Sequence, residues 1–189
     1  MEKADERARM EERAAAVQTI VANVESLDHA FQYAIEVTKS HGGTTIAAPA
    51  LTPEGRSRLA ARCEQSGLRL ITEHVRDHVG TFHTGFTLGD WGVAETATLV
   101  LDSTAEDVRI ATMLSETHVA VLPRSRIRSD AMELESELSE SMKSAPRYFA
   151  FISGASRTAD IERVLTIGVH GPQELHLLIL DEELEGEKP

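Results

Sequence analysis

The loop from residue 153 to residue 160 carries the densest group of side chains that could hold a small ligand. Gly154 permits close approach of the backbone, Ser156 and Thr158 offer hydroxyl donors, and Arg157 offers a planar guanidinium that can bind an anion through two bonds. We expect the loop to follow a buried strand and to open a helix, whose N-terminal amides and dipole would also attract an anion. These residue types predict a carboxylate- or phosphate-binding loop.

The same loop also has a purely structural interpretation. Thr158 would cap the helix, Asp160 and Glu162 would complement its dipole, and Arg157 would point into solvent. Capping accounts for half of these residues but not for Arg157, so the residues alone leave both interpretations open. Asp160 belongs to the candidate ligand-binding residues under the first interpretation.

A second candidate is His170, which lies between two glycines in the turn Gly168–Pro172. An imidazole just before a strand could act as an acid, a base or a hydrogen-bond donor, and we name His170 as a candidate catalytic residue. A turn histidine without such a role is the alternative.

Two carboxylates, Asp90 and Glu95, flank a short apolar strand, with the hydroxyls of Thr87 and Thr96 nearby. A carboxylate pair can work as acid and base, with Glu95 as the candidate base, or can hold cationic or hydroxyl groups of a ligand. Sequence spacing fixes no distance between the two carboxylates, and carboxylates of a hairpin are usually solvated. The pair therefore stays an open candidate.

The histidine spacing and the single cysteine give little indication of a metal site or a reactive thiol. His74 and His78 have an i, i+4 spacing and His83 follows, but a zinc site needs three or four supported ligands, and residues 75–77 lack the glutamate of a metalloprotease motif. We expect no metal here. The single cysteine, Cys63, excludes an internal disulfide and an iron–sulfur cluster held by this chain alone, and we expect it in the core.

The composition restricts the partners. The 189 residues include 19 Lys+Arg and 31 Asp+Glu, and the net charge of -12 opposes binding to nucleic acid or anionic lipid. No run approaches the roughly 20 apolar residues of a membrane span, and the N-terminal residues lack the pattern of a signal peptide. Glycine-rich nucleotide motifs and GxSxG are absent as well. We expect a cytoplasmic protein with neither nucleic-acid nor membrane partners.

Short apolar strands alternate with helices along the chain, and these elements must position the candidates. Strands are expected within residues 16–24, 44–48, 68–72, 91–101 (two strands), 118–122, 147–152 and 175–180. Helices are expected after Ser26, after Thr52, from the capping box Ser103–Glu106, after Ser129 and after the loop 153–160. The helix from Ser129 should have one apolar stripe, formed by Ala131, Leu134, Leu138, Met142 and Ala145.

This alternation predicts a single doubly wound, Rossmann-like α/β domain over residues 15–180, between a solvated polar lead (1–14) and an acidic tail (181–189). The strands that end near Ile152 and Leu180 are apolar on both faces and should be central. Ligands bind beyond the carboxyl ends of strands in such sheets, so we expect the loops at 84–98, 153–160 and 168–172 to meet there.

Three segments carry a resemblance to a known family. Residues 85–99 (GFTLGDWGVAETATL) are similar to the pattern G-[IV]-T-x-A-D-[YF]-A-I-A-E-T-G-[TS]-L, residues 153–162 (SGASRTADIE) to G-P-S-R-T-A-D-I-E, and residues 168–176 (GVHGPQELH) to G-x-H-G-P-x-x-L-H. The chain resembles the lactate-utilization protein C family, which carries the LUD domain, densely over about residues 85–180 and thinly before. Ala97, Ala155 and Gly89 depart from the family's glycine, proline and alanine. Ala97 matters most, because a positive φ there would strain alanine but not glycine.

The resemblance implies a fold like that of ribose-phosphate isomerases and CoA transferases (NagB/RpiA/CoA transferase-like). It also implies membership of a bacterial three-protein system that oxidises L-lactate to pyruvate, whose other two members bind iron–sulfur clusters. We therefore expect a small-anion-binding accessory subunit with iron–sulfur partner proteins, no cofactor of its own, and a possible homo-oligomeric state. The alternative is a self-standing enzyme of the sugar-phosphate isomerase or CoA-transferase kind, with Glu95 as base or nucleophile and His170 as its partner.

Overall fold

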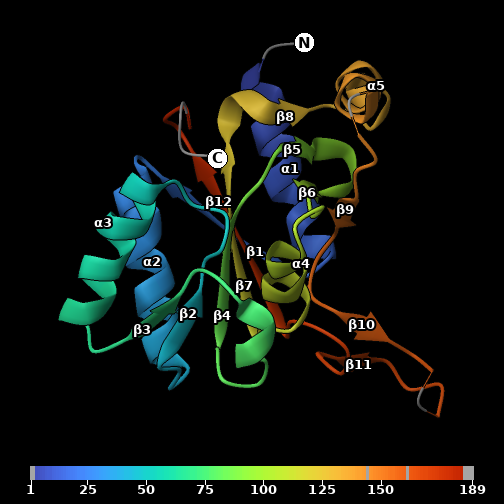
Figure 1. The fold of residues 1–189 in the computed structure, drawn as a ribbon. Helices are drawn as coiled ribbons and strands as arrows, with labels where there is room; N and C mark the ends of the chain where they lie inside the picture. Colours follow the sequence, from blue (N-terminus) through green and yellow to red (C-terminus); the bar gives the residue numbers. More distant parts are fainter. Residues whose placement is uncertain (1–2, 144, 161, 185–189) are drawn as a thin grey trace.

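The structure is a computed structural model that describes residues 3–143, 145–160 and 162–184. At its centre lies a parallel sheet of six strands in the order β1-β12-β7-β4-β2-β3, which runs vertically in Figure 1. The strands are β1 (Thr19–Val24), β2 (Thr45–Ala47), β3 (Arg69–Ile71), β4 (Thr84–Leu88), β7 (Thr117–Pro123) and β12 (Glu174–Leu180). Helices cover both faces of this sheet, which confirms the doubly wound α/β class.

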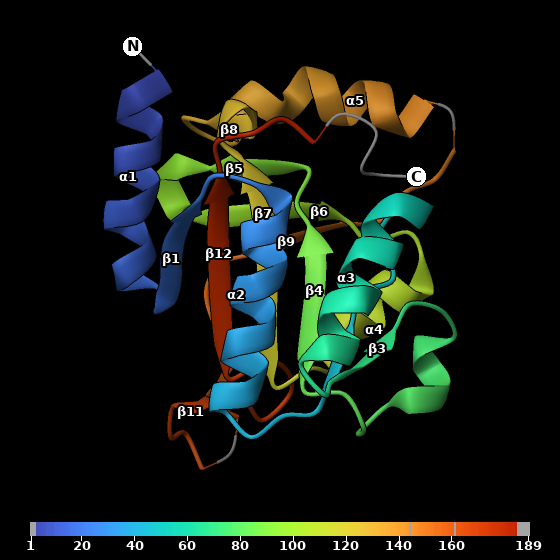
Figure 2. The ribbon, with the colours of Figure 1, turned by 90° about the vertical axis from the view of Figure 1, so that its left-hand side faces the viewer.

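One face of the central sheet is covered by α2 (Leu27–Ser40) and α3 (Pro53–Gln65), as Figure 2 shows. Both helices begin at the predicted caps: the Ser26 hydroxyl accepts the N–H of His29, and the Thr52 hydroxyl accepts the N–H of Gly55. Glycines with positive φ, Gly42 and Gly67, follow the helix ends, as the sequence predicts.

The opposite face is covered by a second, smaller sheet and by further helices (Figure 1). This sheet has the order β8-β5-β6-β9, and its strands are β5 (Trp91–Val93), β6 (Thr98–Asp102), β8 (Ile127–Arg128) and β9 (Phe149–Ile152). The helices on this side are α1 (Lys3–Ala16), α4 (Glu106–Met113) and α5 (Glu135–Lys143). Across the described ranges of the chain, no helix is both long and apolar enough to cross a bilayer.

Helix α1 is part of the packed structure, whereas the sequence predicts a solvated lead. Met10 and Ala14 are fully buried and join Leu99, Leu122 and other apolar side chains between the two sheets. The charged residues of α1 hide this pattern in the sequence, because only one narrow stripe of the helix is apolar.

Strand β9 corrects a second prediction. The sequence predicts a central parallel strand ending near Ile152, but β9 lies at the edge of the smaller sheet, antiparallel to β6, and Phe151 is 51% exposed. The companion prediction for Leu180 is confirmed, since β12 lies between β1 and β7 and is almost wholly buried.

The helix predicted from Ser129 is shorter than expected. A 3-10 turn over Met132–Leu134 precedes α5, which begins only at Glu135, and Met142 remains 52% exposed. The stripe of apolar residues therefore does not mark a buried face: Leu134 is buried, Leu138 is half-buried, and Ala145 lies beyond the helix.

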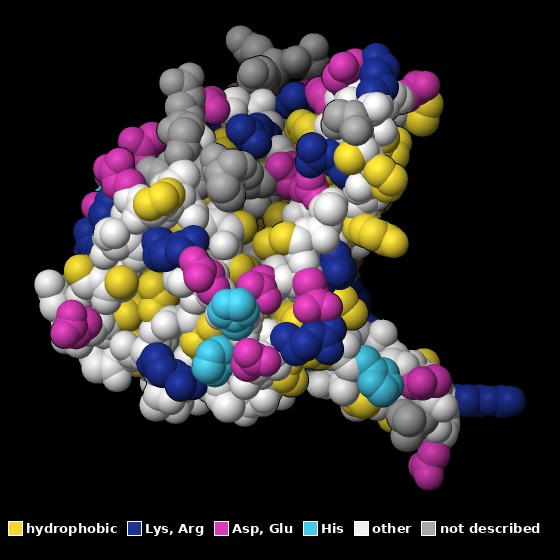
Figure 3. Space-filling model, viewed as in Figure 1, with side chains coloured by type: hydrophobic (Ala, Val, Ile, Leu, Met, Phe, Trp, Pro, Cys, Tyr) yellow, Lys and Arg dark blue, Asp and Glu magenta, His cyan; other side chains and the backbone are white. Residues whose placement is uncertain are grey.

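The loop 153–160 opens a hairpin and not a helix. Strands β10 (Arg157–Thr158) and β11 (Thr166–Ile167) pair antiparallel, and the hairpin stands out from the body as an arm in Figure 3. The predicted helix N-terminus is therefore wrong for the described residues here. Thr158 therefore does not cap a helix, and its hydroxyl donates to the Asp160 carboxylate.

The start of α4 also differs from the predicted capping box. Ala105 is the N-cap residue and makes no side-chain hydrogen bond to the helix. The hydroxyl of Ser103 donates to the carbonyl of Tyr148 at 3.0 Å, and so ties α4 to the segment that leads into β9.

Candidate functional site

The candidate loops do not meet at one end of the central sheet. Asp90 follows the carboxyl end of β4, whereas the turn Gly168–Pro172 precedes the amino end of β12, with the hairpin beside it (Figure 2). Because the carbonyl of Pro172 accepts the N–H of Ser156 at 2.8 Å, the loop 153–160 lies at the amino ends too. The expectation that all three loops gather at the carboxyl ends is therefore wrong.

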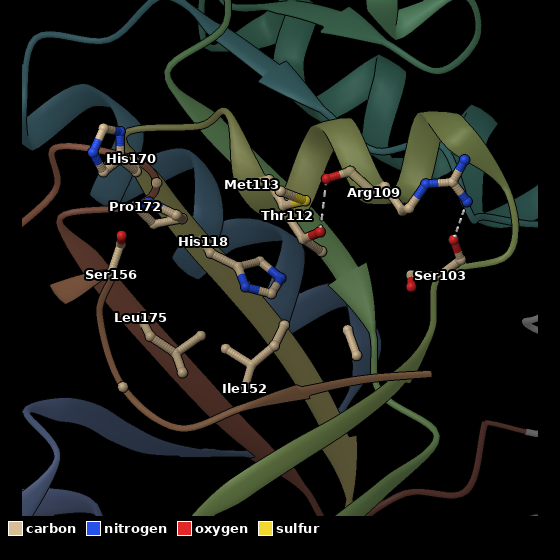
Figure 4. A pocket seen from close by; sticks show the side chains of 13 residues that line it. Ser103, Arg109, Thr112, Met113, His118, Ile152, Ser156, His170, Pro172 and Leu175 are labelled. Carbon is tan, nitrogen blue, oxygen red and sulfur yellow. Dashed lines mark hydrogen bonds between the residues drawn. The ribbon is translucent and has the colours of Figure 1, made fainter. Parts of the chain in front are cut away.

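A pocket of about 240 Å³ lies at these amino ends, between α4, β9 and the first residues of β7 and β12 (Figure 4). Its lining residues are Ser103, Arg109, Thr112, Met113, His118, Ala150, Ile152, Gly154, Ser156, His170, Gly171, Pro172 and Leu175. Three of the predicted site residues, Gly154, Ser156 and His170, are thus brought together. The surface is largely apolar, and none of the described lining residues is acidic.

His118, from the start of β7, forms the polar part of the pocket floor. Its Nε2 lies 2.8 Å from the hydroxyl oxygen of Thr87 on the neighbouring strand β4, and both residues are 1% exposed. Burial lowers the pKa of His118 to about 4, with a smaller contribution from the nearby His176 imidazole. The imidazole is therefore neutral at physiological pH. Thr87, a predicted ligand-binding residue, supports the pocket from behind and does not line it.

Three further polar side chains line the pocket, and each donates hydrogen bonds to backbone carbonyls. The Arg109 guanidinium donates from Nη1 to the carbonyls of Ser103 (2.6 Å) and Thr104 (2.7 Å), and it lies over the Tyr148 ring. Thr112 and Ser103 each donate their hydroxyl to a backbone carbonyl, so toward the pocket they can only accept. Arg109 supplies the basic charge of the wall.

The predicted residues Gly154, Ser156 and His170 form the rim on the hairpin side. Gly154 has a φ of 81°, and a Cβ there would lie 2.0 Å from the carbonyl oxygen of Val17, so only glycine fits. Ser156 is half-buried, and its backbone bonds on both sides to the loop that carries His170. The exposed imidazole of His170 lies 3.9 Å from the Asp160 carboxylate, another predicted ligand-binding residue.

Arg157 does not line the pocket, contrary to the role that its guanidinium suggests. Its Nη2 donates to the carbonyl of Val17 at 3.0 Å and to that of Ser153 at 3.4 Å. The side chain therefore ties the hairpin to the connection between α1 and β1.

The remaining candidates lie outside the pocket. Glu95 is exposed in the 3-10 turn between β5 and β6, where it pairs with Arg9 of α1 at 3.6 Å. The hydroxyl of Thr96 bonds to that of Thr98, which bonds to that of Ser153. Asp90 accepts the N–H of Asp102 at 2.6 Å. The structure thus does not bring Glu95 and His170 into one site.

His118 and Arg109 line the pocket but were not predicted as site residues. One sequence signal could have indicated His118, which is the first residue of the otherwise apolar run HVAVL. A polar residue is unusual in a strand that is buried on both faces, so its presence there suggests a function. Arg109 carried no signal, because an arginine among helix residues is ordinarily solvated.

The structure places the histidine and cysteine candidates in separate surroundings, His83 beside His41 and Glu116 and Cys63 in the core. In the segments that the structure describes, no three His, Cys, Asp or Glu side chains are placed to hold a metal ion. His83 stacks on His41 and faces Glu116 at 3.7 Å. Cys63 is buried in the core, as predicted, and burial raises the pKa of its thiol to about 11.

Comparison with known proteins adds sequence relatives over part of the chain. Lactate utilization protein C 1 of Bacillus mycoides is 34% identical over 102 residues, 52% of this chain and 44% of the relative. Lactate utilization protein C of Macrococcus caseolyticus is 31% identical over 104 residues, 53% and 45% of the two chains. An uncharacterized protein of Neisseria meningitidis serogroup B is 30% identical over 153 residues, which cover 77% of this chain and 64% of the relative. The chain spans about half the length of the curated relatives named for lactate utilization.

A solved structure shares the fold along nearly the whole chain. The crystal structure of a DUF162 family protein from Deinococcus radiodurans superposes with a TM-score of 0.61, covering 95% of this chain and 99% of that one, at 14% identity. At that identity the likeness concerns the fold alone. The family model of the LUD domain matches residues 7–180, which includes α1 and both sheets. The chain is therefore a member of the LUD domain family.

Proposed function

We propose that this chain is an accessory subunit that binds a small organic acid in a bacterial system oxidising L-lactate to pyruvate. Membership of the LUD domain family and the relatives named lactate utilization protein C support the process. The pocket at the amino ends of β7 and β12 supports the ligand class.

The charge of the pocket lining is the observation that carries this proposal. In a chain with a net charge of -12, the described pocket residues include no carboxylate and one arginine, Arg109. Ser156 and His170 add polar groups at the rim, while Leu175 and Ile152 supply an apolar wall. A small acid with an apolar end fits such a surface, because its carboxylate meets no buried like charge. Phosphate, the other predicted ligand, has no apolar portion to use this wall.

Electron transfer would fall to iron–sulfur partner proteins in the cytoplasm. The single thiol of this chain, Cys63, is buried and cannot provide the several cysteine ligands that an iron–sulfur cluster needs. A subunit without redox groups of its own can still bind substrate or product beside partners that carry the electrons.

The self-standing enzyme is the weaker proposal. It needs Glu95 and His170 on one substrate, yet Glu95 pairs with Arg9 and does not line the pocket to which His170 belongs. Turnover of a sugar phosphate or an acyl-CoA by the purified chain would nevertheless establish it in place of the accessory role.

Calorimetric titration of the purified chain with pyruvate and with L-lactate tests the ligand. Ser156→Ala should weaken binding by roughly fivefold, because one ligand hydrogen bond is worth about 1 kcal/mol. Ser139→Ala, an exposed serine on α5, is the matched control and should leave the affinity unchanged. Equal affinities of both variants and the unaltered chain would place the ligand elsewhere.

Deletion of the gene in its own bacterium tests the process. Growth on L-lactate as the carbon source should be lost and restored by a plasmid copy, while growth on glucose should continue. Undiminished growth of the deletion strain on L-lactate would contradict the proposed role.

A further inference from the structure

Thr87 and the pocket residue His118 form a buried hydrogen-bonded pair. Thr87 lies on β4 and His118 on β7, so two paired strands of the central sheet fix their separation. The Thr87 hydroxyl oxygen lies 2.8 Å from Nε2 of His118, and both side chains are 1% exposed. Figure 4 shows the ring among Thr112, Ile152 and Leu175.

Two arrangements of protons satisfy this distance, but they leave different groups unsatisfied. If Nε2 carries the proton, it donates to Thr87, and the Thr87 O–H has no acceptor among the described residues. If Nε2 is unprotonated, it accepts the Thr87 O–H, and the proton of the neutral ring lies on Nδ1. Within the described residues Nδ1 has no hydrogen-bond partner, and the ring it belongs to lines the pocket.

The free-energy cost of these arrangements differs, because His118 lines the pocket and Thr87 does not. An unsatisfied hydroxyl proton behind the ring costs its full desolvation, about 1–3 kcal/mol. An N–H that faces the pocket can bond to water or to a ligand. The second arrangement is therefore favoured.

We propose that Thr87 is a positioning residue that holds His118 in its Nδ1–H tautomer, so that the pocket floor presents a neutral N–H donor to an acceptor oxygen of the ligand. This inference rests on the proposed function for its ligand. It adds that the oxygen bound at the floor belongs to a carboxylate or to a 2-oxo group.

The surroundings of the floor agree with this ligand class. The ring lies beside the apolar side chains of Ile152 and Leu175, and in such surroundings a charge-assisted hydrogen bond to a carboxylate is strong. An ammonium group would meet an N–H donor there and no described carboxylate in the lining. Burial keeps the pKa of His118 at about 4, so the ring donates from its neutral form.

Nitrogen-15 NMR of the histidine rings tests the tautomer without any ligand. In the unaltered chain at pH 7, His118 should show a protonated Nδ1 and an unprotonated Nε2. Thr87→Val should allow both tautomers, and Thr87→Ser should restore the first. Thr84→Val is the matched control, because Thr84 lies on the same strand, is fully buried and bonds to Thr38 and His83 instead. A protonated Nε2 in the unaltered chain overturns the inference.

Titration with pyruvate and with isopropylammonium tests the ligand class in the same spectra. Pyruvate should shift the Nδ1 resonance of His118, and isopropylammonium should not. Thr87→Val should weaken pyruvate binding roughly tenfold, with rescue by Thr87→Ser. A Thr87→Val variant that is folded and binds pyruvate as tightly as the unaltered chain overturns the role of Thr87.

The two proposals fail differently. A His118 ring in the Nε2–H tautomer would contradict the inference while the deletion strain could still lose growth on L-lactate. Undiminished growth on L-lactate would contradict the proposed process while the tautomer and the pyruvate contact could stand.

Discussion

At the scale of single residues, Ala97 shows how a departure from the family pattern affects the structure. It follows the 3-10 turn that contains Glu95, and its φ of 49° and ψ of 45° lie in the left-handed region. The family pattern has a glycine at this position, and a positive φ there strains an alanine but not a glycine. The structure confirms the positive φ, which costs an L-residue roughly 1–2 kcal/mol.

Replacement of two neighbouring alanines by glycine separates this strain from the loss of a buried methyl group. Ala94 begins the same turn without a positive φ, and both alanines are buried. Each variant loses one methyl contact and gains chain entropy on unfolding, but only Ala97→Gly relieves strain. Ala97→Gly should therefore be about 1 kcal/mol more stable than Ala94→Gly in urea unfolding. Equal stabilities would mean that the turn tolerates alanine without strain.

At the scale of elements, local signals predicted α2 and α3 well and failed where distant segments pair. Helix caps and the glycines that follow helices act within a few residues of the chain, so sequence reveals them. The run RYFAFI has apolar residues on both faces, which is typical of a central strand. In the structure β9 pairs only with β6 and therefore lies at the edge of its sheet, and this long-range pairing leaves no local signal in the sequence. The hydroxyls of 153–160 suit a helix cap and a turn equally, and pairing with Thr166–Ile167 decides between them.

The hairpin β10–β11 depends on the contact of Arg157 with Val17. Arg157→Ala removes this bond, so hydrogen exchange of the Thr158 and Thr166 amides should accelerate by about fivefold, which corresponds to about 1 kcal/mol. Global stability and pyruvate affinity should stay nearly unchanged, because the guanidinium lies outside the pocket. Arg163→Ala removes the same charge from the same hairpin and should not alter this exchange. A loss of pyruvate binding with unchanged exchange would instead restore Arg157 as the anion-binding residue.

At the scale of the whole molecule, the composition of the candidate site depends on which loops lie at the same end of the central sheet. The sequence grouped Gly154, Ser156 and His170 with the other candidates, and these three line one pocket. It could not separate them from Asp90 and Glu95, because no local pattern tells which end of the sheet a loop reaches. His118 was missed for a related reason: it lines a pocket only because α4 and β9 lie beside the first residues of β7.

Acid should destabilise the whole fold through two buried histidines and one half-buried histidine. Burial lowers the pKa values of His118, His176 and His83, and for His118 the folded value is about 4 against 6.5. Between these two values the unfolded chain binds more protons than the folded one, so stability is full above pH 6.5 and falls as the pH drops toward 4. For His118 alone the loss amounts to about 3 kcal/mol at most.

Urea unfolding at several pH values between 7 and 4.5 measures this loss, and one substitution assigns it. His118→Leu removes the group that must be charged on unfolding in acid, so the stability of this variant should decline less steeply over that interval. His29→Leu, which replaces an exposed histidine of α2, should keep the slope of the unaltered chain. The slope is the decisive quantity, because the absolute stability of His118→Leu also reflects the lost bond to Thr87. Identical slopes for the His118→Leu variant and the unaltered chain would mean that the folded structure does not lower the pKa of His118.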